Sequence, residues 1–230
     1  MKYIACTSFS PKGYEVYGKK FLETFLEFWP IDIAVFYEGQ KPDISDSRII
    51  YHDLLEDMEF RAFQDEYGYF SGKDYRFMAT KFSPKVFAKT SIRPECDWYI
   101  WVDADVVTTR KIDERFFNET CPGGFTGAYL GRKDWDTSEC GFVPYNLNLG
   151  GGEFLDKFRR IYTTGELFSL PQWHDSFVFD HLREQNVNLW FKNLSENVSG
   201  NHVWPNTILG EYMIHNKGPV AKVEHYGEYA

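Results

Sequence analysis

Residues 98–107 read Trp-Tyr-Ile-Trp-Val-Asp-Ala-Asp-Val-Val and give the clearest indication of the fold. Its first five residues are apolar without a break, which is typical of a parallel strand that is covered on both faces. We therefore expect a central strand here. Asp103 and Asp105 follow it directly, and residues two apart on an extended chain project to the same side. The two carboxylates are thus predicted to converge at the end of the strand.

Strand and helix patterns alternate along the rest of the chain. The apolar runs 3–8 and 31–37 predict strands, and Phe21, Phe25 and Phe28 recur between them at helical spacing. The stretch 60–72 is polar and aromatic, and no element is assigned to it. The remaining expected elements are strands at 48–55, 125–130 and 142–148 and helices at 74–90 (kinked or restarted at Pro84), 154–162 and 174–185. This alternation predicts an α/β domain with helices on both faces of a mainly parallel central sheet that becomes mixed toward its second half.

Composition narrows the class of protein. A chain of 230 residues with 43% hydrophobic and 26% charged residues is typical of one globular domain. A formal net charge of -9 argues against nucleic acid and anionic membranes as partners, because both would repel an acidic surface. An acidic protein that binds a diphosphate needs a cation to offset the charge, which makes a metal site worth seeking.

Residues 1–6 contain only a short apolar run, too brief for a signal peptide, and no stretch of the sequence is long enough for a membrane span. The cysteines contain no CxxC pair, which favours reduced structural thiols over a zinc or redox site. The expected compartment is the cytoplasm.

The pair Asp103 and Asp105 has two interpretations. Paired hard oxygens favour Mg²⁺ or Mn²⁺, and ligand sites in open α/β sheets lie beyond the carboxyl ends of the strands, where this pair falls. Aspartate also commonly ends strands, so both side chains can equally be solvated turn formers. An isolated Asp-x-Asp leaves the two interpretations about equal.

Residues 98–107 resemble the hydrophobic strand and DxD motif of GT-A fold glycosyltransferases, most of all the family 8-like enzymes. The resemblance implies a GT-A-like, Rossmann-like single domain over 1–230, with a nucleotide-sugar-binding half at about 1–107 and an acceptor-binding half at about 108–230. It makes Asp105 the direct ligand of Mn²⁺ (or Mg²⁺). Asp103 would then contact the donor ribose, or the metal through water.

A second resemblance lies near the end of the sequence. Residues 214–218, Ile-His-Asn-Lys-Gly, are similar to the family's His-x-x-Gly segment. The similarity implies that His215 is the third metal ligand and that Lys217 meets the donor phosphates. Lys217 is closer to His215 than in the family pattern, and no Pro-Trp follows. A satisfied core or surface imidazole is the alternative for His215.

Two acidic residues are candidates on the acceptor side. Asp175, at the start of an expected helix, is similar in position to family residues that face the reacting carbon, so it can be the general base. It can equally be a helix N-cap. Glu139 precedes a Cys-Gly pair and is interpreted either as a contact to acceptor hydroxyls or as a solvated loop carboxylate.

On the donor side, the family places the nucleoside against the first strand, which nominates Thr7 and Ser8. Lys81 resembles a basic residue that several members direct at the donor. Strand-end caps and a solvated helix surface are the alternatives for these three residues. Among the tryptophans in polar or turn segments, one is expected to stack on a sugar, although a core role is usual for large rings; they are Trp135, Trp173 and Trp204.

Together the resemblances imply a metal-dependent glycosyltransferase of the hexosyltransferase class. It would move a sugar from a nucleotide-diphosphate sugar, UDP- rather than GDP-linked, to an acceptor hydroxyl. A sugar nucleotidyltransferase is one alternative, although the Gly-rich basic loop of that class is missing at residues 8–13. A haloacid-dehalogenase phosphatase is disfavoured because Val107 stands where that pattern requires Thr. A binding module without turnover is the non-enzymatic alternative.

Overall fold

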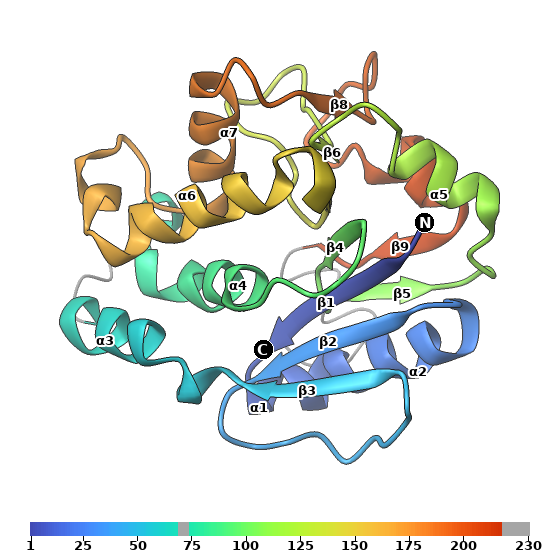
Figure 1. Ribbon diagram of the computed structural model, residues 1–230, viewed down its shortest axis with the longest axis horizontal. Helices are drawn as coiled ribbons and strands as arrows, with labels where there is room; N and C mark the ends of the chain where they lie inside the picture. Colours follow the sequence, from blue (N-terminus) through green and yellow to red (C-terminus); the bar gives the residue numbers. More distant parts are fainter. Residues whose placement is uncertain (69–73, 218–230) are drawn as a thin grey trace.

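The computed structural model describes residues 1–68 and 74–217 (Figure 1). Short 3-10 turns connect several of the elements. The strands are β1 (Tyr3–Phe9), β2 (Asp32–Tyr37), β3 (Ile49–Asp53), β4 (Trp98–Val102), β5 (Val106–Thr108), β6 (Gly127–Tyr129), β7 (Phe142–Asn146), β8 (Phe191–Asn193) and β9 (Met213–His215). The helices are α1 (Pro11–Gly13), which continues through a π-helical turn (Tyr14–Gly18) into α2 (Lys19–Phe28), then α3 (Met58–Tyr67), α4 (Ala79–Ser91), α5 (Glu114–Thr120), α6 (Gly151–Thr163) and α7 (Asp175–Gln185).

Seven strands form the central sheet, in the order β3-β2-β1-β4-β7-β6-β8. The first four of these are parallel neighbours, whereas β7 runs antiparallel to β4 and β6 antiparallel to β7. The expected change from a parallel to a mixed sheet is confirmed. β4 lies in the middle of the sheet with all of its residues buried, as its unbroken apolar sequence predicts.

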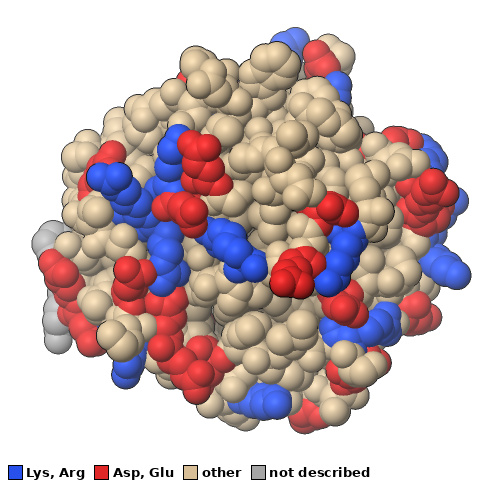
Figure 2. Space-filling model, in the orientation of Figure 1, with Lys and Arg blue, Asp and Glu red and all other residues tan. Residues whose placement is uncertain are grey.

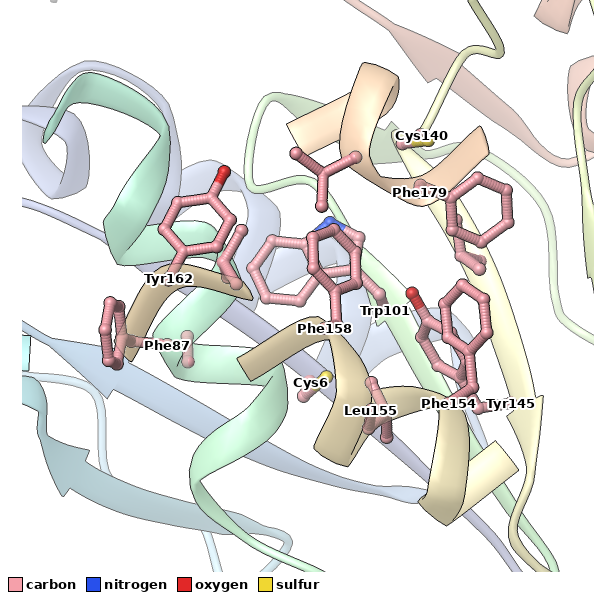
Figure 3. Close-up of a cluster of buried hydrophobic side chains, with 14 of the residues drawn as sticks. Cys6, Phe87, Trp101, Cys140, Tyr145, Phe154, Leu155, Phe158, Tyr162 and Phe179 are labelled. Carbon is pink, nitrogen blue, oxygen red and sulfur yellow. The ribbon is translucent and has the colours of Figure 1, made fainter. Parts of the chain in front are cut away.

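Side chains of β4 alternate between two cores, one on each face of the sheet. Tyr99 and Trp101 pack with residues of α3, α4, α6 and α7, whereas Trp98, Ile100 and Val102 pack with residues of α2 and α5. Figure 1 shows α4 and α6 on one side of the strands and α2 on the other. In the first core Trp101 lies among rings that include Phe154, Phe158, Tyr145 and Phe179 (Figure 3). Both faces are therefore covered, and β4 is fixed from both sides.

A second, two-stranded sheet joins β5 to β9. Val106 pairs with His215 and Thr108 with Met213 in antiparallel register. The amide of Asn216 also donates to the carbonyl of Asp105 at 3.1 Å. This short sheet was not predicted, and it ties the segment around His215 to the residues that follow β4.

α4 begins later than the helix predicted over 74–90. It begins at Ala79, after a 3-10 turn, and continues unbroken to Ser91 through Pro84. A proline removes the amide that would bond the carbonyl four residues earlier, here that of Thr80. Gln64 Nε2 and Ser83 Oγ donate to that carbonyl instead, each at 3.1 Å. Because the freed acceptor is satisfied, the helix neither ends nor restarts.

Part of the stretch 60–72, to which no element was assigned, is also helical. α3 begins after Asp57, whose carboxylate accepts from the amides of Glu59 and Phe60 at 3.1 Å. Phe60 and Phe63 face the core. The rest of the stretch, 69–72, lies outside the described residues.

The distribution of charged side chains and the state of the cysteines can be compared with what the composition indicated. On the face drawn in Figure 2, lysine and arginine side chains lie interspersed with aspartate and glutamate. All four cysteines are free thiols, which confirms the expectation for Cys6, Cys96, Cys121 and Cys140. None of the described helices is both long and apolar enough to span a membrane.

Candidate functional site

Three potential metal ligands meet where β4 ends. Asp103 and Asp105 follow the strand, and the pairing of β5 with β9 places His215 beside them. His215 Nε2 lies 3.2 Å from Asp105 Oδ1 and 3.9 Å from Asp103 Oδ2. One ligand atom from each of the three residues falls within 4.8 Å of the others. Two carboxylate oxygens and an imidazole nitrogen suit Mn²⁺ or Mg²⁺, so the donor set fits the expected cation.

The other nitrogen of His215 is held by Glu139. His215 Nδ1 lies 3.0 Å from Glu139 Oε1, and His202 Nδ1 lies 3.0 Å from the same oxygen. The second carboxylate oxygen accepts from the amide of Val203 at 3.3 Å and lies 3.4 Å from Lys217 Nζ. Glu139 is buried, so it is not the solvated loop carboxylate that was one interpretation. Its contacts orient His215 with Nε2 toward the aspartates.

Neighbouring charges shift the pKa values of His215 and Glu139 in opposite directions. Burial alone lowers the pKa of His215, but Asp105, Glu139 and Asp103 outweigh it and raise the pKa to about 9. Burial alone raises the pKa of Glu139, and hydrogen bonds from His202 and His215 together with the charge of Lys217 bring it below its usual value. Without a bound cation, His215 is therefore an imidazolium near neutral pH.

Gly141 makes room for this arrangement. A Cβ at this position would lie 2.8 Å from His215 Cε1 and 3.3 Å from Asp103 Oδ2. The Gly141 carbonyl also accepts from the amide of Asp103 at 2.8 Å. Any side chain here would push against two of the three candidate ligands.

Lys85 of α4 joins the site to Asp175 of α7. Its Nζ lies 2.8 Å from Asp103 Oδ1 and 3.1 Å from Asp175 Oδ2, and it donates to the Cys140 carbonyl at 2.8 Å. Asp103 Oδ1 also accepts from Trp101 Nε1 at 2.7 Å. Burial lowers the pKa of Lys85, but Asp103 and Asp175 outweigh it and raise the pKa above its usual value. Lys85 is thus a fixed positive charge between two carboxylates.

Lys89 lies one helical turn further along α4 and is fully buried. Its Nζ is 3.9 Å from Asp175 Oδ2 and 4.4 Å from the centroid of the Phe158 ring. Burial lowers the pKa of Lys89. Asp175 is therefore flanked by two lysine side chains from the same helix.

Asp175 is not the N-cap of α7. His174 takes that position, with its Nδ1 accepting from the amide of Phe177 at 3.4 Å, and Asp175 is the first helical residue. Its carboxylate is buried. Burial raises its pKa, but Lys85 and Lys89 outweigh that effect and lower the pKa below the usual value. A carboxylate so stabilised as the anion accepts hydrogen bonds well but is a weak proton acceptor.

Two cavities adjoin at these charged residues and share Lys85, Asp103, Asp105 and Asp175. The first, of about 380 Å³, is also lined by Ser8, Ser10, Tyr17, Glu38, Lys81 and Trp101. The second, of about 470 Å³, is also lined by Arg132, Trp135, Glu139, His174, Asn201 and Lys217. Asp103 and Asp105 line both cavities, and His215 lines the second.

Some of the other predicted site residues line the two cavities, and others do not. Ser8 and the exposed Lys81 line the first cavity, whereas Thr7 is buried and lines neither. Lys217 reaches the second cavity beside Glu139. Gly218, the last residue of the segment that resembles His-x-x-Gly, lies outside the described residues.

The three tryptophans named as possible stacking residues also differ in whether they line a cavity. Trp135 is 48% exposed and lines the second cavity. Trp173 packs against Phe168 with its ring centroid 5.1 Å away, and the buried Trp204 lies 4.8 Å from the His215 ring. Only Trp135 of these three presents its ring to a cavity.

Sequence reasoning missed Lys85, Lys89 and His202. The first two had a usable signal, because Lys81, Lys85 and Lys89 recur every four residues on a helix whose other side chains are largely apolar. Such a row places three cations along one face of the helix that precedes the DxD strand. His202 had no comparable signal.

Comparison with known proteins bears on the fold. No protein-family model matches the sequence, and no curated protein matches it. Among solved structures, apo mouse xyloside xylosyltransferase 1 is similar over 92% of this chain and 92% of its own, with 11% identity and a TM-score of 0.56. A glycosyltransferase involved in glycosylation of the major capsid of PBCV-1 covers 99% of this chain and 100% of its own, at 12% identity and a TM-score of 0.54. The galactosyltransferase LgtC, in complex with donor and acceptor sugar analogs, covers 94% and 87% at 11% identity and a TM-score of 0.56.

These structures share the architecture described above. The expected GT-A-like fold is therefore confirmed. The likeness extends over nearly the whole length of this chain and of those three proteins.

Proposed function

We propose that this protein transfers a sugar from a nucleotide-diphosphate sugar to an acceptor hydroxyl, with a divalent cation held by Asp103, Asp105 and His215. One observation carries the proposal: the three side chains converge at the carboxyl end of β4, where the two cavities meet. Ligand sites in open α/β sheets lie at this edge. The shared fold with solved glycosyltransferases supports the same assignment.

The cation is proposed to be Mn²⁺ or Mg²⁺, and when bound it neutralises charge that develops on the leaving diphosphate. The residues around it supply the remaining charge. Lys85 holds Asp103 in place, and Lys217, which lines the second cavity, is assigned to the donor phosphates. A fixed cluster of this kind stabilises charge without reorganising during the reaction.

The two cavities fit the two substrates. Apart from Asp175, the first is lined by residues within 1–107, and we assign the nucleotide sugar to it, with Ser8 and Lys81 as contacts. The second is lined mostly by residues of the half at about 108–230, and we assign the acceptor to it. Binding both sugars next to the same carboxylates orients the acceptor hydroxyl toward the anomeric carbon.

In the transfer, the bond between the anomeric carbon and the diphosphate oxygen breaks and a bond to the acceptor oxygen forms. The acceptor proton must leave at the same time. Asp175 touches both cavities, but its lysine neighbours make it a weak base. We therefore assign Asp175 to hydrogen bonding with sugar hydroxyls and the leaving diphosphate to proton acceptance, the course proposed for retaining enzymes of this fold.

The donor is proposed to be a UDP-sugar and the enzyme a hexosyltransferase, on the strength of the resemblance to family 8-like enzymes. The test is donor hydrolysis without acceptor, with Mn²⁺ and a panel of UDP- and GDP-sugars. A transferase releases free sugar and nucleoside diphosphate slowly. A nucleotidyltransferase would consume the donor only when pyrophosphate is added, and it would then form a nucleoside triphosphate and a sugar phosphate. A binding module would retain the donor intact.

A further inference from the structure

A polar groove continues the second cavity away from the candidate metal ligands. Its volume is about 350 Å³, and it shares Arg132, Trp135, Thr137 and Ser138 with that cavity. On its far side it is lined by residues of β6, α7, β8 and the segment after β8, including Tyr129, Arg183, Asn193 and Ser195. A ligand longer than the second cavity would therefore enter this groove.

The loop that divides cavity from groove is held rigidly. Leu130 and Glu139 form an antiparallel bridge at its base. Across the loop, Arg132 Nε donates to the Thr137 carbonyl at 2.6 Å, and Arg132 Nη1 donates to Asn201 Oδ1 at 2.8 Å. Trp135, between these anchors, is thus presented at a fixed position.

Trp135 has the properties of a stacking platform. The Arg132 guanidinium lies 5.4 Å from the centre of its ring, and within residues 1–68 and 74–217 no other aromatic ring packs on it. The side chain is 48% exposed in a protein whose other rings are mostly buried. An exposed indole with polar neighbours binds ligands that offer both an apolar face and hydroxyl groups, as a pyranose ring does.

The opposite wall of the groove is also fixed. Asp180 accepts from the amide of Ser138 at 2.6 Å and from its hydroxyl at 2.7 Å, which ties α7 to the loop. The Arg183 guanidinium lies 4.5 Å from the centre of the Tyr129 ring. Both walls are therefore preformed, which lowers the entropy that binding would cost.

The charges of the groove indicate a neutral ligand. Basic and acidic side chains nearly balance, with Arg132, Lys133 and Arg183 against Asp136, Asp180, Glu184 and Glu196. A polyanion would meet the carboxylates, and an apolar chain would leave them unpaired. Alternating donors and acceptors suit the hydroxyls of a neutral sugar chain.

We infer that the acceptor is a neutral oligosaccharide of at least two sugar units, whose terminal unit occupies the second cavity and whose preceding unit stacks on Trp135 and leads into the groove. The inference rests on the proposed function for the fate of the terminal sugar. Binding in the groove, however, requires neither donor nor cation.

The test is to screen the full chain, without donor or metal, on an array of neutral glycans and then to titrate the binders and their terminal monosaccharides by calorimetry. The expected result is that di- and trisaccharides bind about tenfold tighter than the monosaccharide. Trp135→Ala should abolish this difference, and Trp135→Phe should keep part of it. Trp190→Ala is the matched control, because Trp190 is 66% exposed and lies outside the groove.

An array without binders, equal affinity for mono- and oligosaccharides, or an unchanged Trp135→Ala protein would each overturn the inference. Thermal melting checks that the variants fold. Donor hydrolysis with Mn²⁺ separates the two proposals. If the donor is hydrolysed but glycan affinity does not depend on chain length, only the groove inference is refuted. If glycan affinity depends on chain length but the donor is not hydrolysed, only the proposed transfer reaction is refuted.

Discussion

His215 Nε2 lies 3.2 Å from Asp105 Oδ1, although the two residues belong to distant parts of the sequence. The contact arises because Val106, the residue after Asp105, pairs with His215 in the sheet of β5 and β9. The backbone therefore fixes the distance between two candidate metal ligands. The third, Asp103, is fixed by Trp101 and Lys85.

Metal affinity should rise with pH. The pKa of His215 is raised to about 9, so at pH 7 the imidazolium must lose a proton before it can bind a cation. We expect the affinity for Mn²⁺ to increase about tenfold per pH unit between pH 6.5 and 8.5. Calorimetry in buffers of different ionisation enthalpy should detect close to one released proton. Affinity independent of pH in this range would contradict the assignment of His215.

The same pKa shift affects the stability of the metal-free protein. Because the folded pKa of about 9 lies above the unfolded value of 6.5, the contribution of His215 is fully present below pH 6.5 and is lost as the pH rises through 9. Urea unfolding should show this loss between pH 7 and 9. Saturating Mn²⁺ should reverse the trend, since metal binding strengthens over the same range.

Glu139→Gln should weaken metal binding without removing a proposed ligand. The amide keeps the size of the side chain but loses the charge that holds His202 and His215. We expect the pKa of His215 to move closer to its usual value, and we expect the Mn²⁺ affinity, once corrected for the proton that His215 must lose, to fall about 10- to 100-fold. NMR titration of the imidazole reports the change in pKa directly. Glu23→Gln, on the exposed face of α2, is the control and should change neither quantity.

Gly141→Ala should disturb the same site by volume alone. The added Cβ would come within 2.8 Å of His215 Cε1, and His215 is held in place by Glu139 and Asp105. We expect a destabilisation of about 1–3 kcal/mol in urea and weaker Mn²⁺ binding. Gly123→Ala, whose Cβ would meet no atom within 4 Å, should leave both unchanged. Equal behaviour of the two variants would show that His215 moves freely.

Lys85→Met should destabilise the protein far more than Lys81→Met. Lys85 lies between Asp103 and Asp175, and its loss leaves the buried Asp175 with the more distant Lys89. We expect a loss of about 3 kcal/mol in the free energy of unfolding, against less than about 0.5 kcal/mol for the exposed Lys81. Mn²⁺ should recover part of the loss, because it returns positive charge beside Asp103. Similar losses for both lysines would exclude the ion pairs as the cause.

The centre of the fold was predictable because its signal is local. Five apolar residues in a row specify a strand buried on both faces, and the carboxylates after it then have a predictable place at the sheet edge. His215 was predicted as a metal ligand only because residues 214–218 resemble the His-x-x-Gly segment of the family. The strands that bring it to Asp105 have three residues each, too few for a periodic pattern.

The errors have equally specific causes. A restart of the helix at Pro84 was predicted as one possibility because a sequence does not reveal that Gln64 and Ser83 satisfy the freed carbonyl. The N-cap interpretation of Asp175 was wrong, because His174 takes that position. Its role as a base stays a prediction, and its protonation depends on Lys85 and Lys89, which lie on another helix. Contacts between elements of this kind decide both protonation and role, and they have no signature in the local sequence.

Asp105 is proposed to bind the cation on which sugar transfer depends. The most direct measurement is Mn²⁺ titration by calorimetry or electron paramagnetic resonance, run beside UDP-sugar hydrolysis, for wild type, Asp105→Ala and the control Asp65→Ala, whose residue is exposed on α3. We expect Asp105→Ala to lose at least about 100-fold in Mn²⁺ affinity, to lose hydrolysis and to remain folded, whereas Asp65→Ala should match wild type. Unchanged Mn²⁺ binding and hydrolysis in folded Asp105→Ala protein would contradict it.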